Sequence, residues 1–316
     1  MSKKSLNIKI TKENYKYYLA LFAIVFVLHL VSEYIPERTK PSDLDISVDS
    51  SEQLNSEKGI MKVHFLDVDQ GLCIMVQLGE DVLIYDGGER DVSSKVVAYL
   101  KEQGVKEIDY MISSHYDSDH VSGLIGCLRA FNVKNVIGSD YEHESNLYDS
   151  FMEAVKNEGL RMQYPKVGTE YAFGDAVITI LSPKEIQKDS NANSVAIKLS
   201  YDEMDFIFTG DADYVSEKAM VASGIDLDCE VLSAGHHGSS SSSSSLFLEK
   251  TNPYYVVISC GEDNSYGHPH VEVVEMLEAM EVELFRNDVQ GTVVAYTDGE
   301  KIVWSEEPCN DFTDGD

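Results

Sequence analysis

Short apolar segments follow one another from Ile60 onward, and they alternate with segments whose apolar residues recur every three or four positions. The first kind predicts strands and the second predicts helices. In the first half of this region, the pattern predicts strands at 63–68, 73–78, 82–86 and 110–114, and helices at 94–103 and 121–131.

The second half repeats this style. It predicts strands at 177–181, 195–199, 206–209, 230–233 and 255–259, and helices at 214–223, 246–250 and 270–280. Seven consecutive serines, at 239–245, predict a loop that leads into the helix at 246–250. Strand-rich stretches mixed with crossover helices indicate an α+β domain of two packed sheets covered by helices outside, a four-layer sandwich.

The N-terminal region has a different pattern. Residues 17–32 form a charge-free apolar run, and five lysines precede it at positions 3, 4, 9, 12 and 16. Extension to Ile35 gives the roughly 30 Å that a bilayer core requires of a helix. We therefore predict a cytoplasmic basic segment at 1–16 and a single transmembrane anchor at 17–35, with the main domain outside the cell.

A cleaved signal peptide is the alternative interpretation of this run. No small-x-small cleavage site and no lipid-accepting cysteine follows the run, so the sequence favours an uncleaved anchor. Residues 36–59 are acidic and rich in serine, and they contain two prolines without apolar periodicity. This composition predicts a flexible linker, and the folded domain is expected to occupy 60–316.

Composition limits the partners of the domain. The chain has 55 acidic residues against 25 lysines and arginines, which gives a formal net charge of −30. Such a charge repels polyanions unless metal ions or local basic groups intervene, so nonspecific nucleic-acid binding is disfavoured. The five cysteines are scattered, and most are expected to be buried apolar residues and not a disulfide framework.

The densest group of chemically reactive side chains is the stretch SSHYDSDH at 113–120, directly after a predicted strand. It supplies four possible metal ligands, His115, Asp117, Asp119 and His120. A loop at the end of a strand can direct such side chains two ways, which predicts two adjacent metal sites.

Three further groups follow strands later in the chain. Asp211 comes after the apolar strand at 206–209 and suits a ligand shared by two ions. His236 and His237 lie between glycines after the strand at 230–233; one is expected to bind metal and the other to contact substrate. His268 precedes Pro269 at the predicted start of a helix, a position suited to meeting an anion.

Seven stretches resemble, in the same order, the soluble metallo-β-lactamase domain of ComEC-type competence proteins: FLDVDQG, LIYDGG, SSHYDSDHVSGL, NANSVAIKL, FIFTGDAD, LSAGHHGSSS and SYGHPH. A more distant resemblance is to teichoic acid phosphorylcholine esterase. The resemblance implies a metal-binding set of His115, Asp117, Asp119, His120, Asp211 and His236. It also implies substrate contacts for Asn193, His237 and His268, and we expect Asp119 and His268 to act in catalysis.

Two departures from the family pattern stand out. Asp69 replaces a turn glycine, and Leu72 replaces an acidic residue, in the motif that the family usually writes D-V-G-Q-G-D. These changes bear on the geometry of the loop and on activity. ComEC-type proteins also carry a multi-helix channel, whereas this sequence has one hydrophobic segment.

The predicted ligand set fits two divalent ions, zinc or manganese, because four positive charges meet three carboxylates and one bridging hydroxide. Such a hydroxide is a nucleophile at neutral pH. The sequence thus predicts a metal-dependent hydrolase of a phosphodiester, with DNA, a nucleotide or a cell-wall phosphoester as substrate. No protein partner can be inferred from it.

Two other functions remain open. A non-catalytic, metal-stabilised binding protein at the membrane would account for Asp69 and Leu72. A true β-lactamase shares the ligand pattern, but nothing else in the sequence indicates an amide substrate.

Overall fold

The computed structural model describes Leu54 and residues 59–315. The predicted basic segment, membrane anchor and linker lie outside the described residues, apart from the end of the linker. Among the residues that are described, no helix is both long and apolar enough to cross a bilayer.

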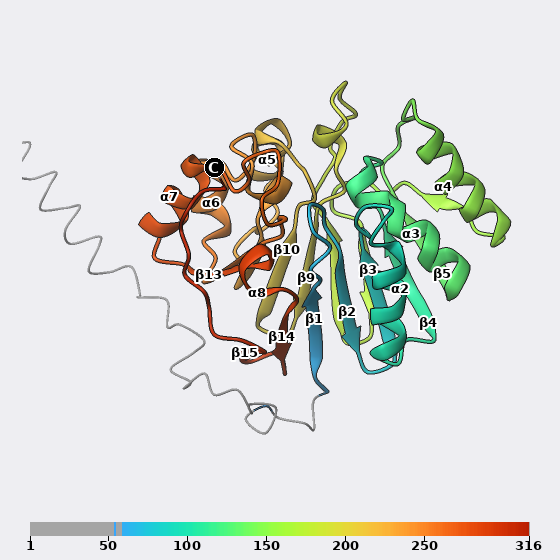
Figure 1. The fold of residues 1–316 in the computed structure, drawn as a ribbon, viewed down its shortest axis with the longest axis horizontal. Helices are drawn as coiled ribbons and strands as arrows, with labels where there is room; N and C mark the ends of the chain where they lie inside the picture. Colours follow the sequence, from blue (N-terminus) through green and yellow to red (C-terminus); the bar gives the residue numbers. More distant parts are fainter. Residues whose placement is uncertain (1–53, 55–58, 316) are drawn as a thin grey trace, which may run out of the picture. The chain divides into compact units, whose positions relative to one another are not determined.

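Two mixed sheets form the centre of the domain (Figure 1). The first has the strand order β15-β14-β1-β2-β3-β4-β5-β6. Its strands are β1 (Met61–Phe65), β2 (Ile74–Leu78), β3 (Asp81–Tyr85), β4 (Glu107–Ile112), β5 (Asn132–Ile137), β6 (Met162–Gln163), β14 (Val293–Thr297) and β15 (Ile302–Trp304). Strands β3 to β6 are parallel neighbours, and the others pair antiparallel.

The second sheet has the order β13-β12-β11-β10-β9-β8-β7. Its strands are β7 (Glu170–Phe173), β8 (Ala176–Ile180), β9 (Ile197–Tyr201), β10 (Met204–Phe208), β11 (Val231–Ser233), β12 (Tyr255–Ile258) and β13 (Glu283–Arg286). Strands β10 to β13 are parallel, so their carboxyl ends lie at one edge of the sheet.

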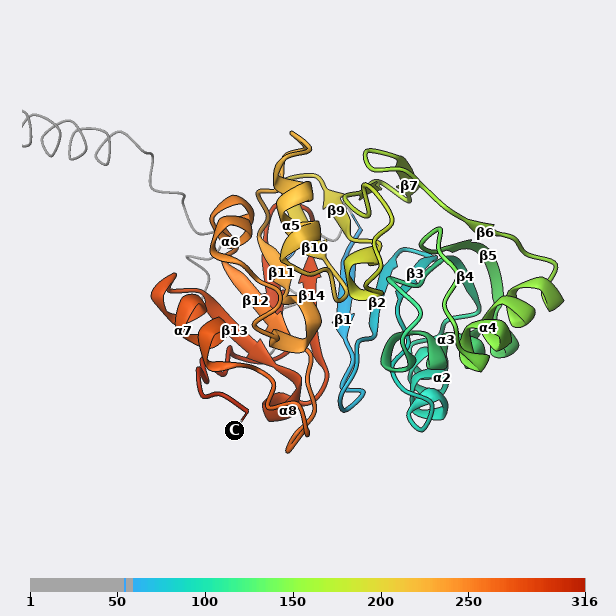
Figure 2. The same cartoon turned by 90° about the horizontal axis from the view of Figure 1, so that it is seen from above.

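Helices cover the outer faces of both sheets (Figures 1 and 2). Helices α2 (Ser93–Glu102), α3 (Ser118–Ala130) and α4 (Asn146–Asn157) pack on the first sheet. Helices α5 (Tyr214–Val221), α6 (Ser245–Thr251) and α7 (Val271–Ala279) pack on the second. The order of layers is therefore helices, sheet, sheet, helices.

The alternation of side chains along the strands creates this order of layers. In β1, Val63 and Phe65 point into the core between the sheets, whereas His64 points toward α2. Phe65 meets Phe208 of the facing sheet at a ring distance of 6.1 Å, and Trp304 stacks on Phe285 at 4.0 Å. These aromatic contacts hold the two inner faces together.

The structure confirms a sandwich of two mixed sheets covered by helices. Within each sheet, parallel strands joined by crossover helices, as in β3-α2-β4-α3-β5, lie beside antiparallel strands. The predicted strands and helices are present with shifts of a few residues. The hydrophobic pattern did not identify β5, α4, β6, β7, β13, β14, β15 and the short helix α8 (Asn287–Gln290).

The cysteines match the prediction. Cys73, Cys127, Cys229 and Cys260 are buried and unpaired, and Cys309 is partly buried.

His64 gives the fold a testable pH dependence. Its side chain is 2% exposed, and its Nδ1 lies 2.9 Å from the hydroxyl of Tyr99. Burial, and secondarily the charge of Lys62, lower the pKa of His64 from 6.5 to about 4. The unfolded chain therefore binds the proton more tightly, and stability falls as pH drops from about 6.5 to about 4.

We predict that His64→Gln, which keeps a polar group near Tyr99 but cannot titrate, flattens this fall by on the order of 3 kcal/mol. Urea unfolding of both proteins at pH 7 and pH 4.5 measures the difference. An unchanged pH slope in the variant would show that His64 is not the titrating group.

Candidate metal centre

Loops from three strand ends form the site. The loop after β4 leads through Ser113 to Asp117 into α3, the loop after β10 carries Asp211, and the loop after β11 carries His236 and His237. Because β10 and β11 are parallel neighbours, their carboxyl ends place the last two loops side by side. Side chains as far apart in sequence as His120 and His237, 117 positions, therefore meet at one place.

The first possible metal-binding group contains His115, His120 and Asp211, all buried, with ligand atoms within 4.8 Å of one another. Asp211 Oδ1 lies 3.1 Å from His120 Nε2, and Asp211 Oδ2 lies 3.9 Å from His115 Nε2. This group combines imidazole nitrogen with carboxylate oxygen, a donor set suited to zinc and manganese.

The second group contains Asp119, His120 and His237. Asp119 Oδ2 lies 3.3 Å from His237 Nε2, which in turn lies 3.2 Å from His120 Nε2. The two groups share His120, and Asp211 Oδ1 is also 3.6 Å from His237 Nε2. They are therefore adjacent halves of one centre, consistent with a binuclear metal site.

The structure places His237, and not His236, inside the second group. The ring of His237 donates from Nδ1 to the carbonyl of Ser259 at 2.9 Å, which directs Nε2 toward Asp119. His236 lies beside the centre, with Nε2 3.5 Å from Asp211, and it contacts Asn191 and Ser241. The sequence assigned metal to His236 and substrate to His237. The geometry places Nε2 of both rings within 3.6 Å of Asp211 and brings His237 together with Asp119 and His120. An exchange of the two roles is therefore a testable prediction.

Both histidines have a left-handed backbone, with φ of 51° for His236 and 58° for His237. Side chains other than glycine rarely adopt this conformation, which costs roughly 1–2 kcal/mol per residue. Such strain is typical of functional sites, where it directs side chains that a regular backbone would point elsewhere.

Asp117 lies at the edge of the centre. Its Oδ2 is 3.6 Å from His115 Nε2, and the Ser190 hydroxyl donates to the same oxygen at 3.2 Å. His143, from the loop before α4, places Nε2 3.2 Å from Asp117 Oδ1. Asp117 is close enough to the first group to complete it with a small side-chain movement.

A buried carboxylate behind the centre fixes the geometry. Asp86, at the end of β3, accepts a 2.8 Å hydrogen bond from His120 Nδ1. It also accepts from the hydroxyl of Ser114 at 2.6 Å and from the Ser114 backbone N–H at 2.7 Å. This contact fixes the tautomer of His120, because the proton on Nδ1 leaves Nε2 available to a metal.

Close backbone contact holds Asp86 against α3. The N–H of Gly87 donates to the carbonyl of His120 at 2.7 Å, and the N–H of Gly123 donates to Gly88 at 3.1 Å. A Cβ at Gly87 or at Gly123 would collide with the backbone of the other segment. Both glycines are therefore required for this approach.

Electrostatics in the centre is dominated by the mixture of imidazoles and carboxylates. Burial opposes ionisation of Asp211, but nearby imidazoles, first His120 and then His237, hold its pKa well below the usual value. Burial likewise lowers the pKa of His120, but the carboxylates around it, chiefly Asp211, outweigh burial and raise its pKa. The site therefore favours positive charge among its carboxylates.

Two buried atoms indicate that a cation fits. His115 Nε2 and Asp211 Oδ1 are buried and have no hydrogen-bond partner within residues 59–315. Unsatisfied buried polar atoms are costly, and metal coordination is one way of satisfying them. The residues that would hold two ions are His115, Asp117, His120, Asp211, Asp119 and His237, with His236 beside them.

Asn193 and His268, the other two residues expected to contact substrate, both lie near the centre and are held by neighbouring residues. The amide of Asn193 is engaged on both sides with backbone groups of Gln187 and Asp189, while the neighbouring Asn191 reaches His236. His268 is only 4% exposed, and the ring of Tyr266 stacks on it. Its ring centroid lies 5.6 Å from that of His236, so it does border the centre.

Asp69 and Leu72, which depart from the family motif, are both accommodated in the conformation of their loop. Asp69 adopts φ of 55°, the conformation a glycine would take, and its N–H donates to Asp67 Oδ1. Leu72 is buried in the core between the sheets. Gln70 lies between them, with Nε2 3.3 Å from His268 Nδ1, and it accepts a hydrogen bond from the N–H of Gly261. The loop therefore supports His268 despite Asp69.

Sequence reasoning did not assign roles to three of these residues. Two of them carry a sequence signal that could have identified them. Asp86 lies at the end of a predicted strand in the stretch LIYDGG, and Gln70 belongs to the stretch FLDVDQG, which resembles the family motif. His143 has no comparable signal, because it lies in a polar loop whose position depends on α4.

Comparison with known proteins defines the family. The model of the Metallo-beta-lactamase superfamily matches residues 66–262. The chain belongs to this superfamily. The crystal structure of the metallo-beta-lactamase fold protein YhfI from Bacillus subtilis shows the same fold at 15% identity and a TM-score of 0.50, covering 72% of this chain and 96% of that one.

Among curated proteins, the chain is distantly homologous to competence proteins. It is 28% identical to ComE operon protein 3 of Bacillus subtilis, over 73% of this chain and 32% of the relative. It is 30% identical to competence protein ComA of Neisseria gonorrhoeae, over 72% and 31%. The chain thus spans about a third of the length of these relatives.

We predict that Asp86→Asn weakens metal binding by about 10- to 100-fold, because the amide no longer fixes His120 as the carboxylate does. Competition with a chromogenic chelator measures the affinity. Asp109→Asn is the matched control, since Asp109 is also buried but bonds Val82 and Lys134 far from the centre. Equal losses in both variants would show a general effect of removing a buried charge.

The exchange of histidine roles is testable directly. His237→Ala is expected to lower metal affinity by about 10-fold or more, and more than His236→Ala does, because only His237 has its free nitrogen inside a ligand group. Metal content per chain and chelator competition measure both. The opposite order would restore the assignment made from the sequence.

Proposed function

We propose that this protein is a metal-dependent hydrolase of phosphodiesters. The observation that carries the proposal is the pair of His/Asp groups that share His120 at the strand ends. Membership in the metallo-beta-lactamase superfamily supports hydrolysis, and homology to competence proteins supports a phosphodiester substrate.

Two divalent ions at this centre would stabilise charge on a phosphoryl oxygen and supply a nucleophile at neutral pH. The residues of the chain hold the metal ligands in position. His120 and His237 are held by Asp86 and the Ser259 carbonyl, so their Nε2 atoms converge without reorganisation. Such preorganisation is the main contribution of a protein to a metal site.

The mouth of the centre is bordered by groups that can contact substrate. His236 is partly exposed, with Nδ1 2.9 Å from the Ser241 hydroxyl. His143 lies against Asp117, with Nδ1 2.8 Å from the Ser145 hydroxyl. Both rings border the centre, where an anionic substrate group would lie. His268 lies behind His236, positioned by Gln70 and covered by Tyr266. We propose that His236 and His143 contact the substrate directly and that His268 acts through His236.

The net charge of −30 favours a small substrate over a long polyanion. It slows the encounter with a long polyanion and favours a nucleotide or another small phosphoester. DNA remains the substrate that homology to the competence proteins suggests. If residues 17–35 form the membrane anchor proposed from the sequence, hydrolysis takes place at the outer face of the membrane.

We predict that the purified full chain hydrolyses bis-p-nitrophenyl phosphate when supplied with Mn or Zn. Asp211→Asn is expected to lower kcat/KM by about 1,000-fold, roughly 4 kcal/mol, because Asp211 contacts both ligand groups. Asp226→Asn is the control, since that side chain is 82% exposed.

Metal analysis of protein purified without chelators completes the test. Less than one bound transition metal per chain would contradict the proposal. Bound metal without hydrolysis of any phosphoester would favour the non-catalytic binding protein. Cleavage of single-stranded DNA at physiological salt would show that the charge does not exclude DNA.

A further inference from the structure

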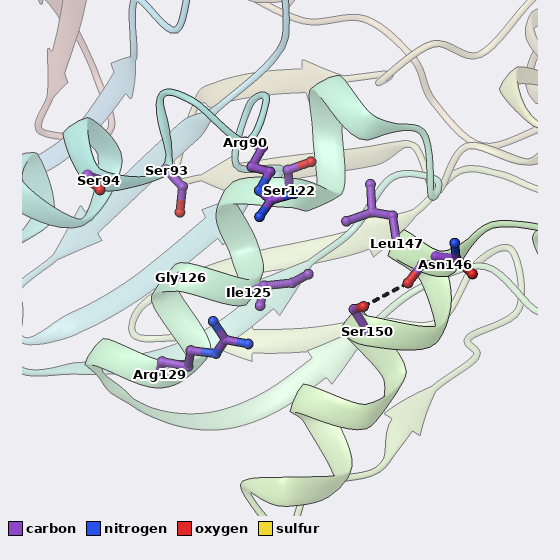
Figure 3. Close-up of a pocket in the computed structure, with 10 residues that line it drawn as sticks. All are labelled: Arg90, Ser93, Ser94, Ser122, Ile125, Gly126, Arg129, Asn146, Leu147 and Ser150. Atoms are coloured by element: carbon purple, nitrogen blue, oxygen red, sulfur yellow. Dashed lines mark hydrogen bonds between the residues drawn. The ribbon is translucent and has the colours of Figure 1, made fainter.

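A second site lies on the outer helical layer, away from the metal centre. A pocket of about 550 Å³ opens between α2, α3 and α4 (Figure 3). Its lining comprises Arg90, Ser93, Ser94, Ser122, Ile125, Gly126, Arg129, Asn146, Leu147 and Ser150. None of these residues takes part in the metal centre.

The charge of this pocket is opposite to that of the chain. The lining has two arginines and no carboxylate, in a chain with 55 acidic residues. The chain has only five arginines, at positions 38, 90, 129, 161 and 286. Two of them therefore line one pocket, whereas Glu153 and Glu158 line an adjoining pocket that shares Arg129 and Ser150.

Neither guanidinium is neutralised by the protein. Within residues 59–315, no ion pair or side-chain hydrogen bond is formed by Arg90 or Arg129, whereas Arg286 binds Asp288 in two places. In Figure 3, Arg90 and Arg129 reach the pocket from opposite ends, with Ile125 between them. Both arginines are exposed, and their donors are free to bind an anion that enters the pocket.

The rest of the lining offers hydroxyl groups and space. Ser93 and Ser94 supply hydroxyls, whereas the hydroxyl of Ser150 donates to the carbonyl of Asn146 at 2.7 Å (Figure 3). Gly126 forms part of the floor, where a Cβ would collide with the Ser93 hydroxyl. Ser122, Ile125, Gly126 and Arg129 share one face of α3, whereas His120 on the same helix points to the metal centre.

We propose that this pocket binds a phosphate group. Arginine is suited to this ligand because its planar guanidinium can donate two parallel hydrogen bonds to phosphate oxygens. A pocket with two unpaired guanidiniums and several hydroxyls matches a phosphate better than a carboxylate or a neutral ligand. The phosphate comes from a nucleic acid strand, a nucleotide or the free ion.

This site goes beyond the proposed function, because it requires no metal and no hydrolysis. It does supply a local basic group of the kind a strongly acidic protein needs to hold a polyanion. A contact between one phosphate and this pocket would partly offset the overall repulsion between the protein and a nucleic acid strand.

The test uses NMR of the full chain titrated with inorganic phosphate. We expect the amide signals of Ser93 and Ser94 to shift on binding. Arg90→Gln and Arg129→Gln should each lower phosphate affinity by about 10-fold or more. Arg161→Gln, at an exposed arginine outside the pocket, should leave this affinity unchanged.

The same titration in the Asp211→Asn background separates the pocket from the metal centre. Shifts at Ser93 and Ser94 that persist there support the pocket even if no phosphoester is hydrolysed. Phosphate that shifts only signals of residues 113–120, or that binds the arginine variants as tightly as the wild type, overturns the proposal.

Two further ligands identify the source of the phosphate. The first is a ten-nucleotide single strand and the second is a nucleoside monophosphate. If the strand binds at the pocket at least about 10-fold more tightly, and its affinity falls steeply with salt, the pocket binds nucleic acid. Equal affinity for the two assigns it to a free phosphate or a nucleotide.

Discussion

Two imidazole nitrogens, Nε2 of His120 and of His237, face each other at 3.2 Å, with the carboxylates of Asp119 and Asp211 beside them. The other nitrogen of each ring is already used, by Asp86 and by the Ser259 carbonyl. Lone pairs this close repel unless a proton or a cation lies between them. The arrangement of the centre therefore depends on positive charge, which a divalent metal supplies.

This requirement explains features away from the ligands. The left-handed conformations of His236 and His237 and the paired glycines behind Asp86 all cost conformational freedom, and all keep the imidazoles in place. Two packed sheets provide the rigid support that such a site needs, since every ligand lies in a loop after a strand or in the first turn of the helix that follows it. The fold thus stabilises an arrangement that would be unfavourable on a flexible chain.

Charge is distributed unevenly between the two ends of α3. Its first turn carries Asp119 and His120 into the metal centre, and its last turn carries Arg129 into the pocket with Arg90. A chain of net charge −30 thus has a place that attracts cations and another that attracts anions, on opposite ends of one helix.

The sequence by itself determined the sandwich and the ligand types, because apolar periodicity and clusters such as SSHYDSDH are local signals. It missed β14 and β15, which complete the first sheet through pairing with β1 across the chain, a non-local contact. The approach of both His236 and His237 to Asp211, the supporting role of Asp86 and the presence of Arg90 and Arg129 in one pocket were decided only by tertiary structure. Each depends on the direction of a side chain, and that direction is set by packing against residues distant in sequence.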